Sequence, residues 1–151
     1  MRIALSADHA GFEMKRELAA LLGTQGHEVL DLGTHSTASV DYPDSAEAAA
    51  MALRDGRAER GIIVCGSGAG VSIAANKFPG IRAAVCHDSY TAHQAVEHDD
   101  MNVLCIGARV IGPSLACDIV AAFLGAVFSR EERHQRRLNK ILAIESRFSR
   151  T

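Results

Sequence analysis

Short, largely apolar segments alternate with longer amphipathic segments along most of the chain. The apolar segments are RIALSA, HEVLDLG, GIIVCG, IRAAVCHD and NVLCIG, which begin at residues 2, 27, 61, 81 and 102. Strands that are apolar along their whole length are buried on both faces, as in parallel sheets covered by helices. The pattern therefore predicts an α/β fold, a Rossmann-like three-layer α/β/α sandwich around a five-stranded parallel sheet.

The segments between these strands contain helix patterns. Residues 14–22 place leucines at helical spacing and end before two glycines. In DSAEAAAMALRDG, Asp44 lies three residues before Glu47, a capping-box pattern that predicts a helix from about Ser45. With 151 residues, 48% of them hydrophobic, and no linker or low-complexity segment, the sequence predicts a single domain over residues 1–151.

Composition indicates where the protein is located and whether its cysteines form disulfides or a metal site. No apolar run reaches the roughly 18 residues that a membrane span needs, and the start, MRIALSADHAG, becomes polar too early for a signal peptide. We therefore expect a cytoplasmic protein without a membrane partner. Cys65, Cys86, Cys105 and Cys117 show no CxxC spacing, so free thiols are expected rather than disulfides or a zinc site.

The C-terminal segment is basic, although the formal net charge of the chain is −2. From Arg130 onward there are seven Arg or Lys against three Asp or Glu. Residues 131–148 have a helical pattern with an apolar stripe, and Arg133 and Arg137 stand four apart on one face. We expect a terminal helix that packs either on its own body or on a partner subunit, with a basic face suited to an anion.

The glycine-rich segment IIVCGSGAGVSIAANK, residues 62–77, follows the third predicted strand directly. It matches a dinucleotide fingerprint only in part, because Val71 stands where the last glycine belongs. It fails as a P-loop, because Lys77 lies seven residues beyond Gly70. What remains is a loop whose backbone N–H groups can hold a phosphate or a developing oxyanion. Beside it, Cys65 is either a reactive thiol or a buried structural cysteine.

Five segments, in order and spacing, resemble those of a known family. ADHAGFEMK, DYPD, CGSGAGVSIAANKFPGIRAAVC, NVLCIGARVIG and RHQRR are similar to motifs of the type B ribose-5-phosphate isomerases, whose family also includes galactose-6-phosphate and allose-6-phosphate isomerases. The resemblance covers nearly the whole chain. It implies an aldose–ketose isomerisation through an enediolate without metal or organic cofactor. It also implies an active site shared by two subunits of a homodimer, which the terminal helix would help to form, alone or within a tetramer.

The resemblance further implies roles for single residues. Cys65 resembles the base that takes the proton from C2, since the glutamate used by some members would stand at Val71. His98 resembles the histidine that opens the sugar ring, and Ser67 resembles the loop hydroxyl that contacts the reacting oxygens. Tyr42 is either a residue that lines the sugar pocket or a core tyrosine. The substrate-binding residues implied in the same way are Asp8, His9, Gly66, Ser67, Gly68, Ala69, Gly70, Asp99, Arg109, Arg133 and Arg137, the three arginines for the phosphate.

Asp99 departs from the family pattern, which has an asparagine at this position. An ionised carboxylate cannot donate the amide's hydrogen bond and repels an enediolate or a phosphate. Either the Asp99 carboxyl is protonated or turned away, or the preferred substrate differs from ribose 5-phosphate. In the second case the chain is an isomerase of allose 6-phosphate, galactose 6-phosphate or a tetrose phosphate. A non-catalytic module that binds nucleotides or sugar phosphates is a further alternative. A nucleic-acid partner is not expected, because the basic segment offers only Phe148 for base stacking.

Overall fold

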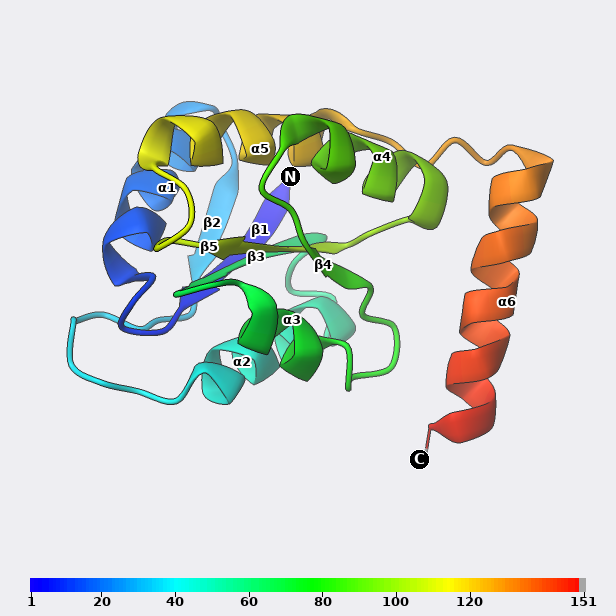
Figure 1. Ribbon diagram of the computed structural model, residues 1–151, viewed down its shortest axis with the longest axis horizontal. Coiled ribbons are helices and arrows are strands. Elements are labelled where there is room, and N and C mark those ends of the chain that lie inside the picture. The colour runs from blue at the N-terminus through cyan, green and yellow to red at the C-terminus, as the bar shows by residue number, and fades with distance from the viewer. Residues whose placement is uncertain (150–151) are drawn as a thin grey trace.

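The computed structural model describes residues 1–149, so the last two residues of the predicted 1–151 domain lie outside the described residues. Strands and helices alternate from β1 to α5, and a sixth helix follows (Figure 1). The elements are β1 (Arg2–Ala7), α1 (Phe12–Thr24), β2 (Glu28–Asp31), α2 (Tyr42–Arg54), β3 (Arg60–Cys65), α3 (Ala69–Ala75), β4 (Ala83–Val85), α4 (Ser89–Asp99), β5 (Val103–Gly107), α5 (Pro113–Gly125) and α6 (Glu132–Phe148).

The five strands form one parallel sheet in the order β2-β1-β3-β5-β4. β3 is the central strand, and its Ile62 is in register with Leu5 of β1 on one side and Leu104 of β5 on the other. The predicted five-stranded parallel sheet is confirmed. From β1 the chain goes outward to β2 and then returns past β1 to β3, so that a crevice between two strand ends opens at the carboxyl ends of β1 and β3.

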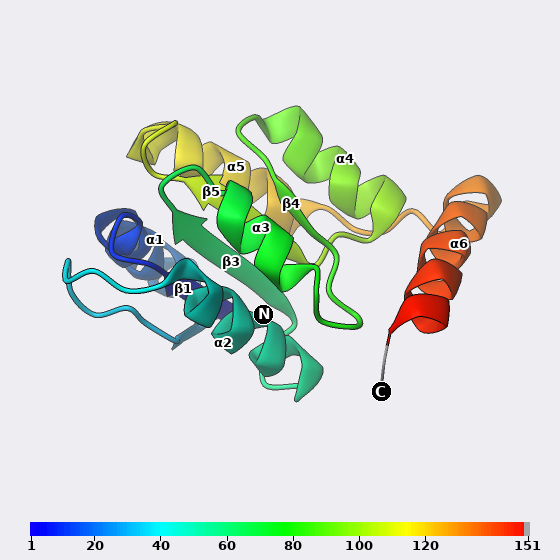
Figure 2. The same ribbon diagram turned by 60° about the horizontal axis from the view of Figure 1, so that its bottom comes forward.

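Helices cover both faces of the sheet. α1, α4 and α5 lie on one face, and α2 and α3 lie on the other (Figures 1 and 2). Side chains alternate along β3: Ile62 and Val64 pack in the first layer, whereas Ile63 and Cys65 pack in the second. In the second layer, α2 packs close to the sheet because its buried residues are small. They include Ala46, Ala49, Ala50 and Ala52.

Helix α2 begins earlier than the capping-box pattern predicts. It starts at Tyr42, with Asp41 as a cap residue that makes no side-chain capping bond and with Pro43 in the first turn. The predicted start near Ser45 is wrong because proline is tolerated in a first turn, where its missing N–H would have no partner. Asp44 therefore lies inside the helix, and the early start holds Tyr42 at the end of α2 that faces the carboxyl ends of the strands.

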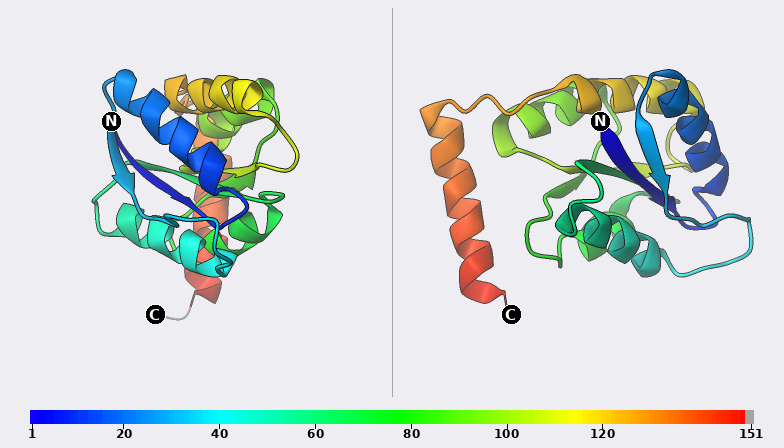
Figure 3. Two further views of the ribbon diagram at one scale, coloured as in Figure 1. Left: turned by 90° about the vertical axis from the view of Figure 1, so that its left-hand side faces the viewer. Right: turned by 180° about the vertical axis from the view of Figure 1, so that it is seen from behind.

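Helix α6 stands away from the rest of the fold (Figures 1 and 3). Of its predicted apolar stripe only Leu138 is buried, at 5% exposure, while Ile141, Leu142 and Phe148 stay exposed. Its contacts with the body run mainly to α4. None of the helices found in residues 1–149 has the length and apolar character that a bilayer crossing requires.

A buried ion pair joins α1 to the end of β2. The side chain of Lys15 is almost fully buried, and its Nζ lies 2.5 Å from Oδ1 of Asp31, whose side chain is 40% exposed. Burial acts to raise the pKa of Asp31, but hydrogen bonds from Lys15 and from the Gly33 N–H outweigh it, so the pKa lies below its ordinary value. The Asp31 carboxylate is therefore ionised at neutral pH.

We expect Asp31→Asn to lower the free energy of unfolding by about 2 kcal/mol, because it leaves Lys15 charged and buried without its counter-ion. Urea denaturation at pH 7 measures the change. Adding Lys15→Met to Asp31→Asn removes the buried charge, so the double variant should recover most of the loss. A single variant as stable as the parent would contradict the stabilising role of this pair.

Candidate active site

The carboxyl ends of β1, β3 and β5 bring together many of the predicted site residues. Asp8 follows β1, Cys65 ends β3, and Arg109 lies just after β5. The hollow between them, here called the carboxyl-edge pocket, has a volume of about 320 Å³ and lies at the strand-end crevice where parallel α/β sheets bind ligands. Its lining residues are Asp8, Tyr42, Cys65, Gly66, Ser67, Gly70, Arg109 and Val110.

The sulfur of Cys65 accepts a hydrogen bond inside this pocket. The Gly68 N–H donates to Cys65 Sγ at 3.1 Å, and the Cys65 side chain is almost buried. Gly68 has a φ of +82°, a left-handed conformation that glycine adopts without strain, and this turn directs its N–H back toward the sulfur. A hydrogen bond to sulfur stabilises negative charge on it. Cys65 is thus both nearly buried and placed where it can take up and return a proton.

The other thiols lack such a setting. Cys86 and Cys105 lie in the core, where burial raises the pKa of both thiols, that of Cys86 to about 11. Cys117 is half-buried on α5. All four cysteines are free, as their spacing predicts. Within residues 1–149 no three His, Cys, Asp or Glu side chains are grouped as metal ligands would be.

The glycine loop carries the polar groups of the pocket floor. Ser67 is exposed, and its Oγ accepts the N–H of Ala69, the first residue of α3. The ring of Tyr42 lies so close over Gly70 that a Cβ there would come within 2.7 Å of it. Arg109 is tied to the loop from the other side, because its N–H donates to the Gly66 carbonyl at 3.0 Å.

Asp8 and His9 hold the loop that follows β1. Oδ1 of Asp8 accepts the N–H groups of Ala10 and Gly11 at 3.0 and 3.1 Å, so this carboxylate caps the turn before α1 as well as lining the pocket. Nδ1 of His9 accepts the Val40 N–H at 3.2 Å. The His9 contact thereby joins the segment after β1 to the 34–41 loop.

The remaining predicted residues lie at the opposite end of the sheet, beside the amino ends of the strands. Helix α4 runs antiparallel to the strands, so its last turn, with His98 and Asp99, lies near the amino end of β5. The ring of His134, in the first turn of α6, stacks on His98 with centroids 4.0 Å apart. Arg133 and Arg137 flank His134 and are exposed. His98, Asp99, Arg133 and Arg137, here called the amino-edge group, are therefore not brought together with Cys65 in one chain.

Two residues that shape the glycine loop are absent from the sequence-based site. The Gly107 N–H donates to Nε2 of His87 at 2.9 Å, and a Cβ on Gly107 would come within 2.6 Å of the Ser67 carbonyl group. The glycine at the end of the predicted strand NVLCIG is a sequence signal that could have indicated Gly107, because glycine in a strand is typical of a close approach by another backbone segment. The sequence places His87 in the segment CHDSY, which follows a predicted strand, but its contact with Gly107 depends on β4 pairing with β5 and not with its chain neighbour β3.

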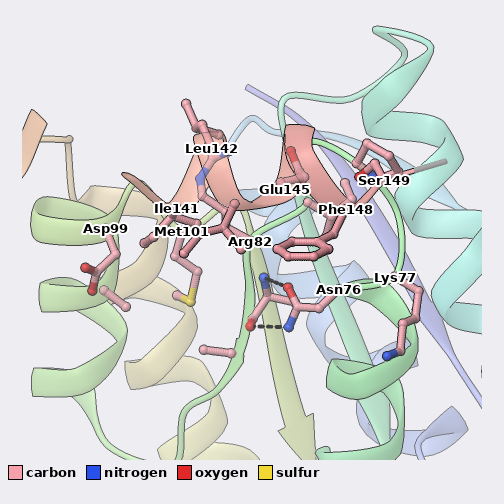
Figure 4. A pocket seen from close by; sticks show the side chains of 16 residues that line it. Asn76, Lys77, Arg82, Asp99, Met101, Ile141, Leu142, Glu145, Phe148 and Ser149 are labelled. Atoms are coloured by element: carbon pink, nitrogen blue, oxygen red, sulfur yellow. Dashed lines mark hydrogen bonds between the residues drawn. The ribbon is translucent and has the colours of Figure 1, made fainter. Parts of the chain in front are cut away.

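A second and larger hollow lies between α6 and the β4 edge of the sheet (Figure 4). This α6 groove has a volume of about 610 Å³. Ile141, Leu142 and Phe148 of α6 line one wall, and Met101 lies on the other. Oε1 of Glu145 accepts the Gly80 N–H at 3.0 Å and ties α6 to the body there. The groove is an open apolar surface at the same side of the molecule as the amino-edge group.

Comparisons with known proteins identify a family. The family model described as Ribose/Galactose Isomerase matches residues 3–141. Ribose-5-phosphate isomerase B of Escherichia coli is 49% identical to the chain over 146 residues, which are 97% of each protein. The D-erythrulose-4-phosphate isomerase of Pectobacterium atrosepticum is 43% identical over 129 residues, 85% of each.

A solved structure agrees with the fold. Ribose-5-phosphate isomerase B of Clostridium thermocellum superposes with a TM-score of 0.96 at 50% identity, covering 99% of this chain and all of that chain. The similarity extends over the sheet, both helical layers and the terminal helix, which confirms the α/β/α architecture expected from the sequence.

We expect Gly107→Ala to lower the free energy of unfolding by about 1–3 kcal/mol, because its Cβ would collide with the backbone of Ser67. Urea denaturation measures the loss. Gly125→Ala is the matched control, since no other atom lies within 4 Å of a Cβ there and alanine favours the helix that Gly125 ends. Equal losses of stability in the two variants would show that a Cβ at Gly107 fits without a collision.

Proposed function

The chain belongs to the ribose/galactose isomerase family, and we propose that it interconverts ribose 5-phosphate and ribulose 5-phosphate through an enediolate. Family membership makes the chain a sugar-phosphate isomerase. The proposed substrate is inferred from its residues. One observation carries the proposal: the sulfur of Cys65 lies in the carboxyl-edge pocket with the Gly68 N–H bonded to it. This geometry suits a thiol that alternates between taking and giving a proton.

Cys65 is the base of the isomerisation. Its thiolate takes the proton from C2 of the open-chain aldose, and the C2 electron pair forms the C1–C2 double bond while the C1 carbonyl oxygen gains the charge. The C2 hydroxyl proton passes to the C1 oxygen, so the O2 electron pair forms the C2 carbonyl while the C1–C2 double bond takes the proton back from the Cys65 thiol at C1. The enediolate oxygens lie within reach of the glycine loop, where the Ser67 hydroxyl and backbone N–H groups supply donors. No cofactor takes part in these steps.

The closed furanose form of ribose 5-phosphate must open before this chemistry. Opening removes the proton of the C1 hydroxyl, protonates the ring oxygen and breaks the bond between that oxygen and C1. An imidazole can carry both protons in turn, because it exchanges protons near neutral pH. We assign this role to His98, as the family resemblance implies.

A second copy of the chain supplies His98 to each site. Within one chain Cys65 ends a strand and His98 ends a helix that runs the other way, so the two lie at opposite edges of the sheet. A homodimer in which the carboxyl-edge pocket of one chain faces the amino-edge group of its partner completes two identical sites. The exposed apolar surface of the α6 groove gives such a dimer an area to bury.

The phosphate is bound by cations from both chains. Arg109 lines the carboxyl-edge pocket, and Arg133 and Arg137 come from the partner's α6. Guanidinium groups pair with phosphate oxygens in a bidentate manner, and two of them four residues apart on one helix can reach the same anion. The same argument accounts for a basic first half of α6 beside an apolar second half.

Asp99 favours a second candidate substrate. Its exposed carboxylate follows His98 in the chain, and an ionised carboxylate can accept but not donate hydrogen bonds and would repel anionic oxygens. A relative named for D-erythrulose 4-phosphate is 43% identical to the chain, so a tetrose phosphate is the alternative to the pentose phosphate, with allose 6-phosphate and galactose 6-phosphate further from the proposal.

We expect Cys65→Ala to lower kcat on ribose 5-phosphate by about 10²- to 10⁴-fold with little change in KM, because it removes the base and leaves the phosphate-binding groups in place. Cys117→Ala is the control, since that thiol lies on α5 outside the pocket. Assays with ribose 5-phosphate, ribulose 5-phosphate, allose 6-phosphate, galactose 6-phosphate and a tetrose phosphate fix the substrate. Full turnover by Cys65→Ala would exclude this residue as the base.

Mixing two inactive variants tests the shared site. In a mixed dimer of Cys65→Ala and His98→Ala chains, one site lacks both residues and the other has both. Random reassociation makes half of the dimers mixed, so about a quarter of the parent activity should return. The control mixes Cys65→Ala with Cys65→Ala,His98→Ala, a pair in which no site is complete. Absence of any recovery after exchange of subunits would contradict a site built from two chains.

A further inference from the structure

Two histidines from distant parts of the sequence stack at the amino edge of the sheet. The rings of His98 in α4 and His134 in α6 are 4.0 Å apart at their centroids and inclined by 25°. His134 is 2% exposed, whereas His98 is only half-buried and keeps one face toward the surface. One ring is thus enclosed by the fold and the other rests on it.

The enclosed ring is itself held by a serine. Nδ1 of His134 lies 2.6 Å from Oγ of Ser129, in the segment that joins α5 to α6. The same Oγ accepts the Glu131 N–H at 3.2 Å, and the Ser129 N–H donates to the Glu97 carbonyl in the last turn of α4. Since Oγ already accepts one hydrogen bond, its own proton is free to donate to Nδ1, which leaves the ring proton of a neutral His134 on Nε2.

The charges around His134 favour its neutral form. Burial lowers the pKa of His134 first, and the neighbouring His98, Arg133 and Arg137 lower it further. Glu131 acts in the opposite direction but does not reverse the shift. A neutral ring can lie against His98 whether or not His98 carries a proton, whereas a second cation would oppose protonation of His98.

We propose that His134 is a positioning residue for ring opening: held by Ser129, its neutral imidazole forms a flat support that fixes the orientation of the His98 ring. The inference rests on the proposed function, because it gives His98 a proton-transfer role. His134 acts through His98 and need not touch the substrate. A misaligned imidazole transfers protons poorly, so loss of the support slows ring opening and leaves the chemistry at Cys65 intact.

Deuterium exchange separates these two steps. Ribulose 5-phosphate cannot close a furanose ring, because its C5 oxygen carries the phosphate. In D₂O the enzyme exchanges a C1 hydrogen of ribulose 5-phosphate through the enediolate, and this step needs Cys65 but not ring opening. NMR measures the exchange, and a coupled assay measures kcat/KM on ribose 5-phosphate.

For His134→Ala we expect kcat/KM on ribose 5-phosphate to fall about 10- to 100-fold, while the C1 exchange rate stays within about threefold of the parent. His134→Phe keeps a flat ring and should lose less than about fivefold in kcat/KM. His93→Ala is the matched control. It removes an exposed histidine of α4 that pairs with Glu97 and not with another ring, and it should leave both rates unchanged.

Two results would overturn the assignment. Parent-like kcat/KM in His134→Ala would show that His98 needs no support. An equal loss of exchange and isomerisation in both the alanine and the phenylalanine variants would show a general structural role. Failure of the proposed function is distinct from both, because the parent enzyme itself would then neither exchange C1 hydrogens nor isomerise ribose 5-phosphate.

Discussion

The direction of the chain in a parallel sheet controls where every functional group of this protein lies. All five strands point the same way, so each connecting helix must run back in the opposite direction. A residue at the C-terminal end of a strand therefore lies at the carboxyl ends of the strands, whereas a residue at the C-terminal end of a helix lies beside their amino ends. Cys65 and His98 are such a pair, and their separation makes a second chain a requirement of the proposed mechanism and not an addition to it.

Close packing between backbone segments gives the carboxyl-edge pocket its shape. Gly107 lets β5 pass directly under Ser67, and Gly70 lets the ring of Tyr42 lie on the start of α3. These close approaches leave no room for a side chain. Glycine is therefore required at both positions because of space, and not because the loop must be flexible. Within this loop the left-handed conformation of Gly68 directs its N–H at the sulfur of Cys65.

Helix α6 presents different side chains along its length. Its first turns carry His134, Arg133 and Arg137 and connect with the end of α4 through the stacked rings. Its second half presents Ile141 and Phe148 to the open groove, where a single chain leaves them exposed. In the proposed dimer, stability and catalysis would be coupled, since a partner that covers the apolar half also receives the basic half in its active site.

The sequence by itself determined the fold class, the order of the strands along the chain and the family. RIALSA coincides with β1, whereas only Ala83–Val85 of the predicted strand IRAAVCHD forms β4. Sequence patterning misplaced the start of α2, where Pro43 in a first turn overrode the Asp44 and Glu47 pattern.

Only the tertiary structure decided how the site is divided. The contacts of His87 with Gly107 and of His98 with His134 join residues 20 and 36 positions apart, through strand order in one case and helix docking in the other. Local sequence patterns report propensity and periodicity within one element. They carry no information about which elements become neighbours, and that choice depends on the summed burial of both faces of the sheet.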